Sequence, residues 1–266
     1  MPGTDNAAWW FWAPFLGAFG LIGFWETFAP LRSSPVSTPR RWAVNAFLLG
    51  LANLAQAVVL RASPGVAAMA SSDAGFGLLP QSGFPLAAQW VAAILALDLM
   101  RYLQHVGAHK VGLLWRMHQV HHADPHYDLT TGLRFHPLEA LFNNGTYLVF
   151  VSLLGPPVLA TLIVEAAAGF QSLFAHANAN LPAGFDRHLR RIWITPNLHR
   201  VHHSTDHAEQ NSNFGVLLPV WDMIFGTYRA APGLPQEMMP VGLDGLSRHD
   251  ASNVLTLLAM PFRRRP

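Results

Sequence analysis

Long apolar runs are the feature that most limits how this chain can fold. Residues 7–30, 43–60 and 84–105 contain few charged side chains, and residues 141–176 form a fourth, longer run. A helix of about 20 residues crosses the roughly 30 Å hydrocarbon core of a bilayer, because each residue adds about 1.5 Å. The runs therefore predict an all-α protein that crosses a membrane about four times.

The fourth run is too long to be a single span. Gly155, Pro156 and Pro157 divide it, and proline removes a backbone donor and clashes with the preceding turn of a helix. We expect one helix before residues 155–157 and another that runs back after them. Together the runs predict one membrane-embedded domain over residues 1–266, with a helical cap on the cytoplasmic side.

Basic side chains gather in the segments that follow the first, third and fifth predicted helices, and at the end of the chain. They are Arg32, Arg40 and Arg41; Arg101, Lys110, Arg116 and Arg134; Arg187, Arg190, Arg191 and Arg200; and Arg263, Arg264 and Arg265. Loops rich in Lys and Arg stay in the cytoplasm. This pattern predicts an outside N-terminus and a cytoplasmic C-terminus and cap. We expect the membrane to be a bacterial inner membrane; a location in the endoplasmic reticulum would need the same orientation.

Composition excludes several other classes of protein. Half of the chain is apolar and only 12% is charged, which is the opposite of a disordered chain. The 17 basic and 15 acidic residues nearly balance, so a nucleic-acid partner is not expected. Cysteine is absent, which excludes disulfides, iron–sulfur clusters and a cysteine nucleophile.

The histidines are the second constraint, because all 14 lie from His105 onward and many of them are closely spaced. Three groups stand out: His105 and His109; His118, His121 and His122; and His199, His202 and His203. Residues three and four apart share a helix face, so we expect each group to direct its imidazoles into one volume. Imidazole is a common ligand of iron, zinc, copper and nickel. Eight convergent rings exceed the needs of one ion and predict two.

The role of other polar residues is more open. His188 and His249 are expected to be ordinary histidines, whereas His126, His136 and His207 could support the metal site or be ordinary polar residues. A metal-bound imidazole usually donates its other N–H to a carboxylate or carbonyl. The candidate carboxylates are Asp98, Asp124, Asp128, Asp206 and Asp222.

Two polar residues, Asp98 and Arg134, have competing interpretations. Asp98 lies seven residues before His105 and faces roughly the same way on a helix, but it could instead pair with Arg101. Arg134 could bind the headgroup of a substrate or the phosphate of an ordinary lipid.

The histidine groups, in this order and after apolar spans, resemble the fatty acid hydroxylase/sterol desaturase superfamily of integral-membrane, non-haem di-iron enzymes. The likeness includes the segments around the histidines, which are residues 98–102, 114–118, 130–139, 211–215 and 221–227. It covers roughly residues 26–262 and is densest over residues 98–228.

The resemblance implies a ninth metal-binding histidine, His176, on the helix before the third group. Some relatives carry another histidine four residues later, where this chain has Asn180. Asn180 is therefore a candidate that binds metal directly, through water, or not at all.

The resemblance also implies a reaction. Two iron ions, which zinc can replace in purified protein, would use O2 to hydroxylate an unactivated C–H bond of a lipid such as an acyl chain or a sterol. A separate electron-transfer protein of the ferredoxin or cytochrome type would supply the electrons. Desaturation of a lipid at the same site is the alternative within this class.

Two other classes of function were weighed against an enzyme. A metal transporter would place its ligands near the middle of the membrane and acidic residues along the path. A b-type cytochrome would use two axial histidines and leave the other six histidines of the three groups without a role.

Overall fold

The computed structural model describes residues 4–33 and 38–263, and these residues form helices, turns and loops. Within these ranges the only β-type pairings are two isolated bridges, Pro30 with Ala179 and Ser204 with Val241. The prediction of an all-α protein is therefore confirmed. Arg264 and Arg265 of the basic tail lie outside the described residues.

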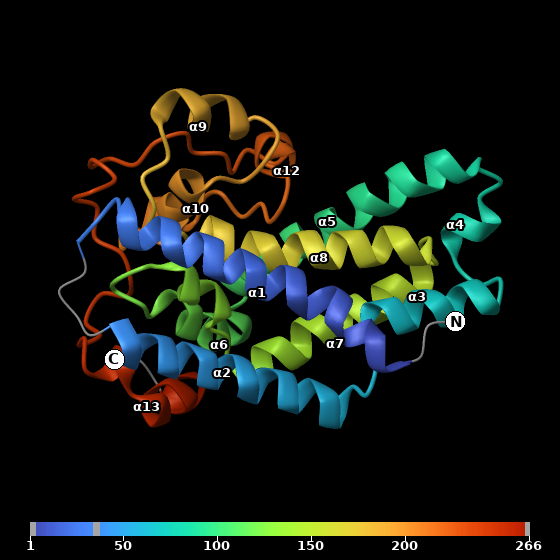
Figure 1. Ribbon diagram of the computed structural model, residues 1–266, viewed down its shortest axis with the longest axis horizontal. Coiled ribbons are helices and arrows are strands. Elements are labelled where there is room, and N and C mark those ends of the chain that lie inside the picture. Colours follow the sequence, from blue (N-terminus) through green and yellow to red (C-terminus); the bar gives the residue numbers. More distant parts are fainter. Residues whose placement is uncertain (1–3, 34–37, 264–266) are drawn as a thin grey trace.

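Five long helices form the body of the molecule (Figure 1). They are α1 (Thr4–Phe28), α2 (Thr38–Val59), α5 (Leu86–Lys110), α7 (Pro137–Leu154) and α8 (Val158–Ala175). Each overlaps an apolar run of the sequence. The body holds its own core, in which Leu97, Tyr147, Val151 and Val164 are buried.

The predicted break in the fourth run lies between α7 and α8. Helix α7 ends at Leu154, and Gly155 takes the left-handed conformation at φ 60° before the two prolines. A Cβ on Gly155 would come within 2.5 Å of the Phe76 carbonyl oxygen, so glycine is required there for space as well as for conformation.

Two short helices between α2 and α5 were not expected from the sequence. They are α3 (Pro64–Asp73) and α4 (Leu78–Gln81). Helix α3 packs against both α7 and α8. It contains mainly small residues, so it lacks the long apolar run that marked the other helices.

Three helical stretches among the described residues are long and apolar enough to cross a membrane. They are Thr38–Asp73, Leu86–Lys110 and Val158–Ala175. Large apolar side chains such as Leu21, Val58 and Val149 remain exposed on the long helices, as a surface in contact with lipid requires. The number of four spans stays a prediction.

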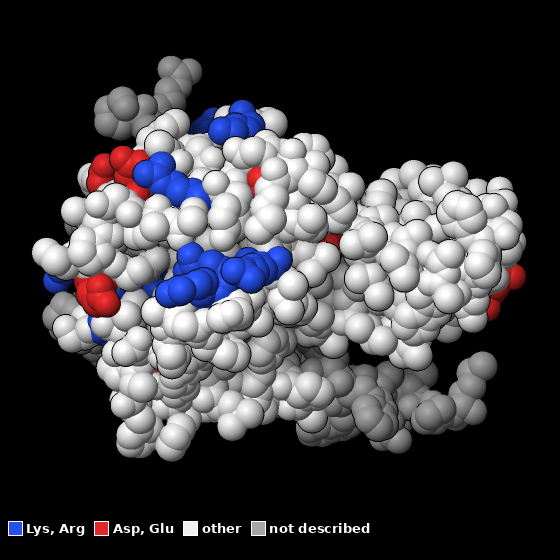
Figure 2. Space-filling model, turned by 90° about the horizontal axis from the view of Figure 1, so that it is seen from above, with Lys and Arg blue, Asp and Glu red and all other residues white. Residues whose placement is uncertain are grey.

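The remaining elements form a cap at the end of the body where α5 and α8 finish (Figure 1). They include α6 (Gly112–His122), η1 (Leu129–Leu133), α9 (Ala183–Leu189), α10 (Pro196–His202), α11 (His207–Gln210), α12 (Val220–Ile224), η2 (Asp250–Ser252), α13 (Val254–Ala259) and η3 (Met260–Phe262). In Figure 2 most of the charged side chains on the visible face lie over the cap, and the surface beyond it is nearly uncharged.

The cap is held to the body by a close approach of η1 to α8. The Ser172 hydroxyl donates to the Gly132 carbonyl at 2.6 Å. A Cβ added to Gly132 would lie 1.9 Å from the Ser172 carbonyl oxygen and 3.0 Å from His176 Nδ1. The backbones can meet at this distance only because residue 132 has no side chain.

We predict that Gly132→Ala destabilises the protein, because the added methyl group must push η1 away from α8. Overpacking of this kind costs about 1–3 kcal/mol, and it should lower the midpoint of thermal unfolding in detergent. Gly112→Ala is the matched control, since a Cβ at that position meets no atom within 4 Å. Equal unfolding midpoints for the two variants would contradict the prediction.

Candidate metal centre

Nine buried or half-buried histidines meet where α5, α6, α8 and α10 come together. They form two groups, within each of which the candidate ligand atoms all lie within 4.8 Å of one another. Group A contains His105, His109, His118, His122 and His202, and group B contains His121, His176, His199 and His203. The structure thus brings together every histidine that the sequence and the resemblance singled out as a metal ligand.

Each three-histidine motif serves both groups, which differs from the expectation that a motif points into one volume. In α6, His118 and His122 enter group A while His121 enters group B. In α10 and the residue that follows it, the assignment is reversed: the pair four residues apart, His199 and His203, enters group B and His202 enters group A. The reason is helical geometry, because residues four apart lie closer in direction than residues three apart.

In group A, backbone and carboxylate oxygens hold three of the five rings through Nδ1, so that Nε2 stays free. The Nδ1 atoms of His105 and His202 lie 2.8 Å from the carbonyl oxygens of Phe214 and Ser212. These carbonyls require Nδ1–H donors. The Nε2 atoms of all five group A histidines are buried and have no hydrogen-bond partner among the described residues. An ion bound by these nitrogens would satisfy them.

In group B the free nitrogens face one another. His176 Nε2 lies 3.2 Å from Nε2 of His121, 3.2 Å from Nε2 of His203 and 3.1 Å from Nε2 of His199. Nitrogens about 2.1 Å from one ion lie about 3.0–3.4 Å apart in octahedral or tetrahedral geometry. These nitrogen separations therefore fit a shared ion.

Burial favours the neutral form of six of the rings. It lowers the pKa of His176 to about 4. Burial, followed by the charge that neighbouring histidines would carry, lowers the pKa of five more rings well below its ordinary value; these are His121, His122, His199, His202 and His203. Neutral imidazole is the form that binds a metal. The donor set thus fits metal ions at neutral pH.

Glu139 is a contributor that sequence reasoning did not identify as part of the site. Its Oε1 lies 2.6 Å from His118 Nδ1, and both side chains are almost fully buried. The carboxylate orients the ring so that His118 Nε2 faces group A. Glu139 lies in the first turn of α7, and only its position inside the segment that resembles the superfamily marked it in the sequence.

Asp98 acts on the site through the backbone and makes no hydrogen bond to a histidine ring among the described residues. It accepts hydrogen bonds from the Leu217 and Leu218 backbone N–H groups and from the Trp221 indole. Asp222 likewise accepts from the backbone N–H groups of Phe214 and Gly215, each at 2.8 Å. The two carboxylates fix the loop whose Phe214 carbonyl holds His105.

Arg134 has a different role from the headgroup contact considered from the sequence. It is buried, and its donors reach the Val120 carbonyl, the Asn45 side chain and the Ala251 carbonyl. Burial lowers its pKa to about 10, which leaves it charged at neutral pH. A guanidinium enclosed in this way ties α2, α6 and η2 together and does not reach a lipid.

Asp124 and Asp128, like Arg134, stabilise the contact between α2 and the cap, and they are not the carboxylates that orient the clustered histidines. Arg41 of α2 pairs with Asp124 at 3.1 Å and with Asp128 at 3.0 Å. Burial would raise the pKa of Asp124, but the guanidiniums of Arg41 and Arg134 outweigh it and hold that pKa below its usual range. These pairs anchor the start of α2 to the loop after α6.

Three other candidates lie outside both groups. Helix α8 ends at Ala175, so Asn180 is not one helical turn after His176; it is exposed, and its N–H donates to the Ala29 carbonyl. His136 caps α7 through a hydrogen bond from the Leu138 N–H. Asp206 caps α11 by accepting from Ala208 and Glu209 N–H groups.

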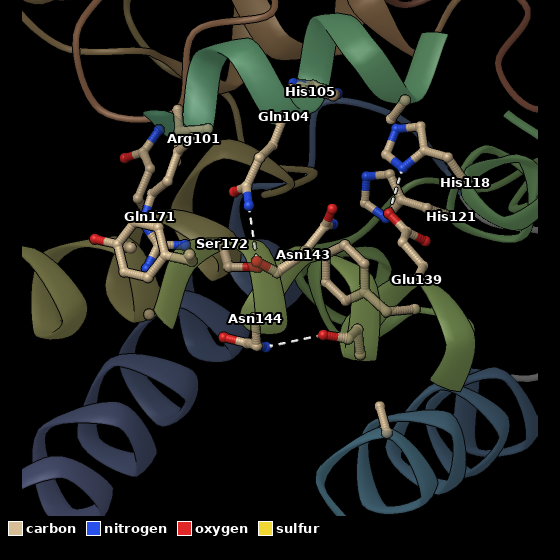
Figure 3. A pocket seen from close by; sticks show the side chains of 18 of the residues that line it. Arg101, Gln104, His105, His118, His121, Glu139, Asn143, Asn144, Gln171 and Ser172 are labelled. Atoms are coloured by element: carbon tan, nitrogen blue, oxygen red, sulfur yellow. Dashed lines mark hydrogen bonds and ion pairs between the residues drawn. The ribbon is translucent and has the colours of Figure 1, made fainter. Parts of the chain in front are cut away.

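A cavity of about 350 Å³ lies beside the two groups, between α2, α5, α7 and α8. Five of the histidines line it: His105 and His118 of group A, and His121, His176 and His199 of group B. Figure 3 shows His105, His118 and His121 on one side of this space and Arg101 and Gln171 on the other. A molecule in the cavity would touch both histidine groups.

The fold and the site define a class of protein, namely helical membrane proteins that bind metal through clustered histidines. Within that class, a sequence model of the fatty acid hydroxylase family matches residues 90–227, just over half of the chain. The chain belongs to the fatty acid hydroxylase family, and the resemblance stated from the histidine motifs is confirmed.

Curated relatives share the central part of the chain. Ornithine lipid hydroxylase OlsE of Rhizobium tropici is 33% identical over 183 residues, which are 68% of this chain and 53% of that protein. Alkylglycerol monooxygenase of Danio rerio is 32% identical over 139 residues, or 52% of this chain and 30% of the relative. The human alkylglycerol monooxygenase is 31% identical over 141 residues, or 53% and 31%.

The chain therefore spans about half or less of the length of these relatives. No solved structure gives a significant match.

We predict that Glu139→Leu weakens metal binding by about 10–100-fold, the usual effect of removing a group that orients a ligand. Glu139→Gln should weaken it less, because an amide oxygen can still accept from His118 Nδ1. Competition with a chelator measures the affinity. Asp206→Asn is the control, since Asp206 caps α11 and contacts no histidine; an equal loss in all three variants would contradict the assigned role.

Proposed function

We propose that this protein is a membrane-bound, O2-dependent hydroxylase of a polar lipid, with two iron ions held by the nine histidines. The observation that carries the proposal is the cavity, which lies among apolar helices and is bordered by both histidine groups. A lipid could enter it from the bilayer and place a C–H bond beside both metal positions. The relatives, an ornithine lipid hydroxylase and alkylglycerol monooxygenases, support this substrate class.

Bound iron would supply activation of O2 and insertion of one oxygen atom into the C–H bond, with two electrons and two protons reducing the other oxygen atom to water. The residues of the chain provide the geometry for this reaction. The histidines hold the ions, while Glu139 and the Phe214 and Ser212 carbonyls orient the rings. The apolar part of the cavity wall, such as Leu49 and Phe135, keeps bulk water away from the reacting carbon.

The alternatives considered from the sequence fit less well. A transporter would need its ligands halfway along the helices, whereas His109 lies in the last turn of α5 and His176 directly after α8. A b-type cytochrome would use two of the nine rings. Desaturation would remove two hydrogen atoms from the lipid without adding oxygen, so the mass of the product separates it from hydroxylation.

The proposal includes an orientation and a partner. The cap, both histidine groups and the C-terminus face the cytoplasm of a bacterium, and the N-terminus lies outside. A separate electron-transfer protein of the ferredoxin or cytochrome type reduces the iron from that side. The basic side chains over the cap in Figure 2 support a cytoplasmic cap.

Loss of one ligand from each group tests the metal assignment. We expect His121→Ala in group B and His202→Ala in group A each to lower the iron content of the purified protein from two per chain to about one. Product formation should fall by roughly 100-fold or more, since even groups that only orient a ligand contribute about 10–100-fold. Plasma emission spectrometry measures the metal, and mass spectrometry of extracted lipids measures the added oxygen.

His188→Ala is the control for this experiment, because His188 is exposed and its Nδ1 bonds only to the Gly184 carbonyl. Full metal content and full oxidation in His121→Ala and His202→Ala would refute the two-ion site.

The orientation has its own test. A reporter that is active only in the cytoplasm, fused after Pro266, should be active, because the Arg-rich segments hold this face inside. A second reporter that is active only outside the cell, fused at the same place, should be silent. The reverse result would overturn the proposed topology.

A further inference from the structure

The cavity beside the histidines has a polar wall that an acyl chain would not need. Amide and charged side chains reach it from four membrane helices: Gln56 of α2; Arg101 and Gln104 of α5; Asn143 and Asn144 of α7; and Glu165 and Gln171 of α8. Polar side chains between membrane helices are costly and usually mark a functional site. The polar wall therefore indicates that the polar part of a lipid enters the cavity.

The amides of this wall are held in fixed positions. Gln104 Nε2 donates to the Asn143 carbonyl and to the Thr146 hydroxyl, each at 2.7 Å, and Asn144 Nδ2 donates to Gln56 Oε1 at 2.5 Å. The side-chain amide of Asn143 makes no hydrogen bond with the described residues. Figure 3 places it between Gln104 and the histidines. It offers one donor and one acceptor group to a molecule in the cavity.

The far side of the wall carries one positive and one negative group. Arg101 pairs with Glu165, and the Arg101 guanidinium lies 4.3 Å from the centre of the Tyr147 ring. Arg101 Nε is buried without a hydrogen-bond partner among the described residues, and the Tyr147 side chain interacts with both Arg101 and Glu165. This corner holds polar groups that the protein itself does not fully satisfy.

The balance of charge limits the ligand. A ligand with a net charge would leave one side chain of the Arg101–Glu165 pair facing a like charge in a poorly solvated cavity, which is unfavourable. A zwitterionic group can place its anion near Arg101 and its cation near Glu165. The cavity thus favours a headgroup without net charge that carries both signs.

Distance limits which carbon reacts. Arg101 precedes His105 by four residues on α5, which is about 6 Å along a helix. A cavity of about 350 Å³ is also near the lower end of the roughly 300–1,000 Å³ of ordinary ligand sites, so only part of a lipid with two chains fits. A headgroup held at Arg101 would therefore present to the histidines a carbon only a few bonds away.

We propose that the cavity binds the zwitterionic headgroup of a lipid, so that the oxidised carbon lies in the headgroup or next to it and not far along an acyl chain. This inference rests on the proposed lipid hydroxylase function. Arg101, Glu165 and Asn143 are the residues that select the headgroup, and the acyl chains stay in the bilayer.

Binding of lipids to the iron-loaded full chain tests the selection without turnover. Native mass spectrometry in detergent compares three lipids with identical acyl chains: zwitterionic phosphatidylethanolamine, anionic phosphatidylglycerol and uncharged diacylglycerol. The wild type should bind the zwitterionic lipid most tightly. Asn143→Leu should weaken that binding by about three- to tenfold, the effect of one lost hydrogen bond, whereas Asn53→Leu on the exposed face of α2 should not.

Charge variants make the test specific. Glu165→Gln leaves Arg101 without its partner and should shift the preference to phosphatidylglycerol. The double variant R101Q/E165Q removes both charges and keeps hydrogen-bonding groups, so it should lose the preference for the zwitterion even if the single variant folds poorly. Equal binding of the three lipids by the wild type, or an unchanged preference in the double variant, overturns the inference.

The position of the new oxygen distinguishes this inference from the proposed function. Tandem mass spectrometry of the product should find the oxygen in the headgroup fragment or on the carbons next to it. Oxygen on a distant acyl carbon would overturn the inference and leave lipid hydroxylation intact. If iron-loaded protein oxidised no lipid, the proposed function would fail, and the binding preferences would still decide whether the cavity selects a zwitterionic headgroup.

Discussion

The structure depends on holding nine imidazole rings together in the interior of the protein, with ring nitrogens that face one another. Such a group of rings is unfavourable alone, because buried polar atoms need partners. Five Nε2 atoms of group A have none among the described residues, and those of group B face each other at 3.1–3.2 Å. Metal ions bound by these nitrogens would satisfy them. The rest of the cap holds the rings in position.

That positioning uses the backbone more than charged side chains. Backbone carbonyls fix four of the rings through Nδ1, and they belong to Phe214, Ser212, Ser172 and Arg134. Among the described residues only His118 relies on a carboxylate. The buried carboxylates of Asp98 and Asp222 do not contact these rings directly. They accept hydrogen bonds from the backbone of the loop that carries the Phe214 carbonyl, and so hold that loop in place. Keeping negative charge away from most of the ligands leaves the site with neutral donors.

The long helices and eight of the nine clustered histidines could be predicted from the sequence because both depend on local patterns, whereas His176 was implied only by the family resemblance. The apolar runs can be recognised from composition, and the break at residues 155–157 from the properties of proline. Helical spacing identifies the histidine motifs. Glu139 and the carbonyls were not predicted, since their roles arise from contacts between distant segments. Asn180 was considered because the helix was assumed to continue, whereas α8 ends at Ala175. The role of Arg134 could not be predicted from the sequence either, because its burial depends on how distant segments pack around it.

The sharing of each three-histidine motif between two groups has a mechanical consequence. Helices α6 and α10 each contribute to both groups, and the His122 and His203 rings stack across the boundary with centroids 4.3 Å apart. An ion in either group would therefore constrain the rotation of both helices, because each helix supplies rings to both groups. The two positions are thus coupled mechanically: a displacement of one helix would disturb both groups at once.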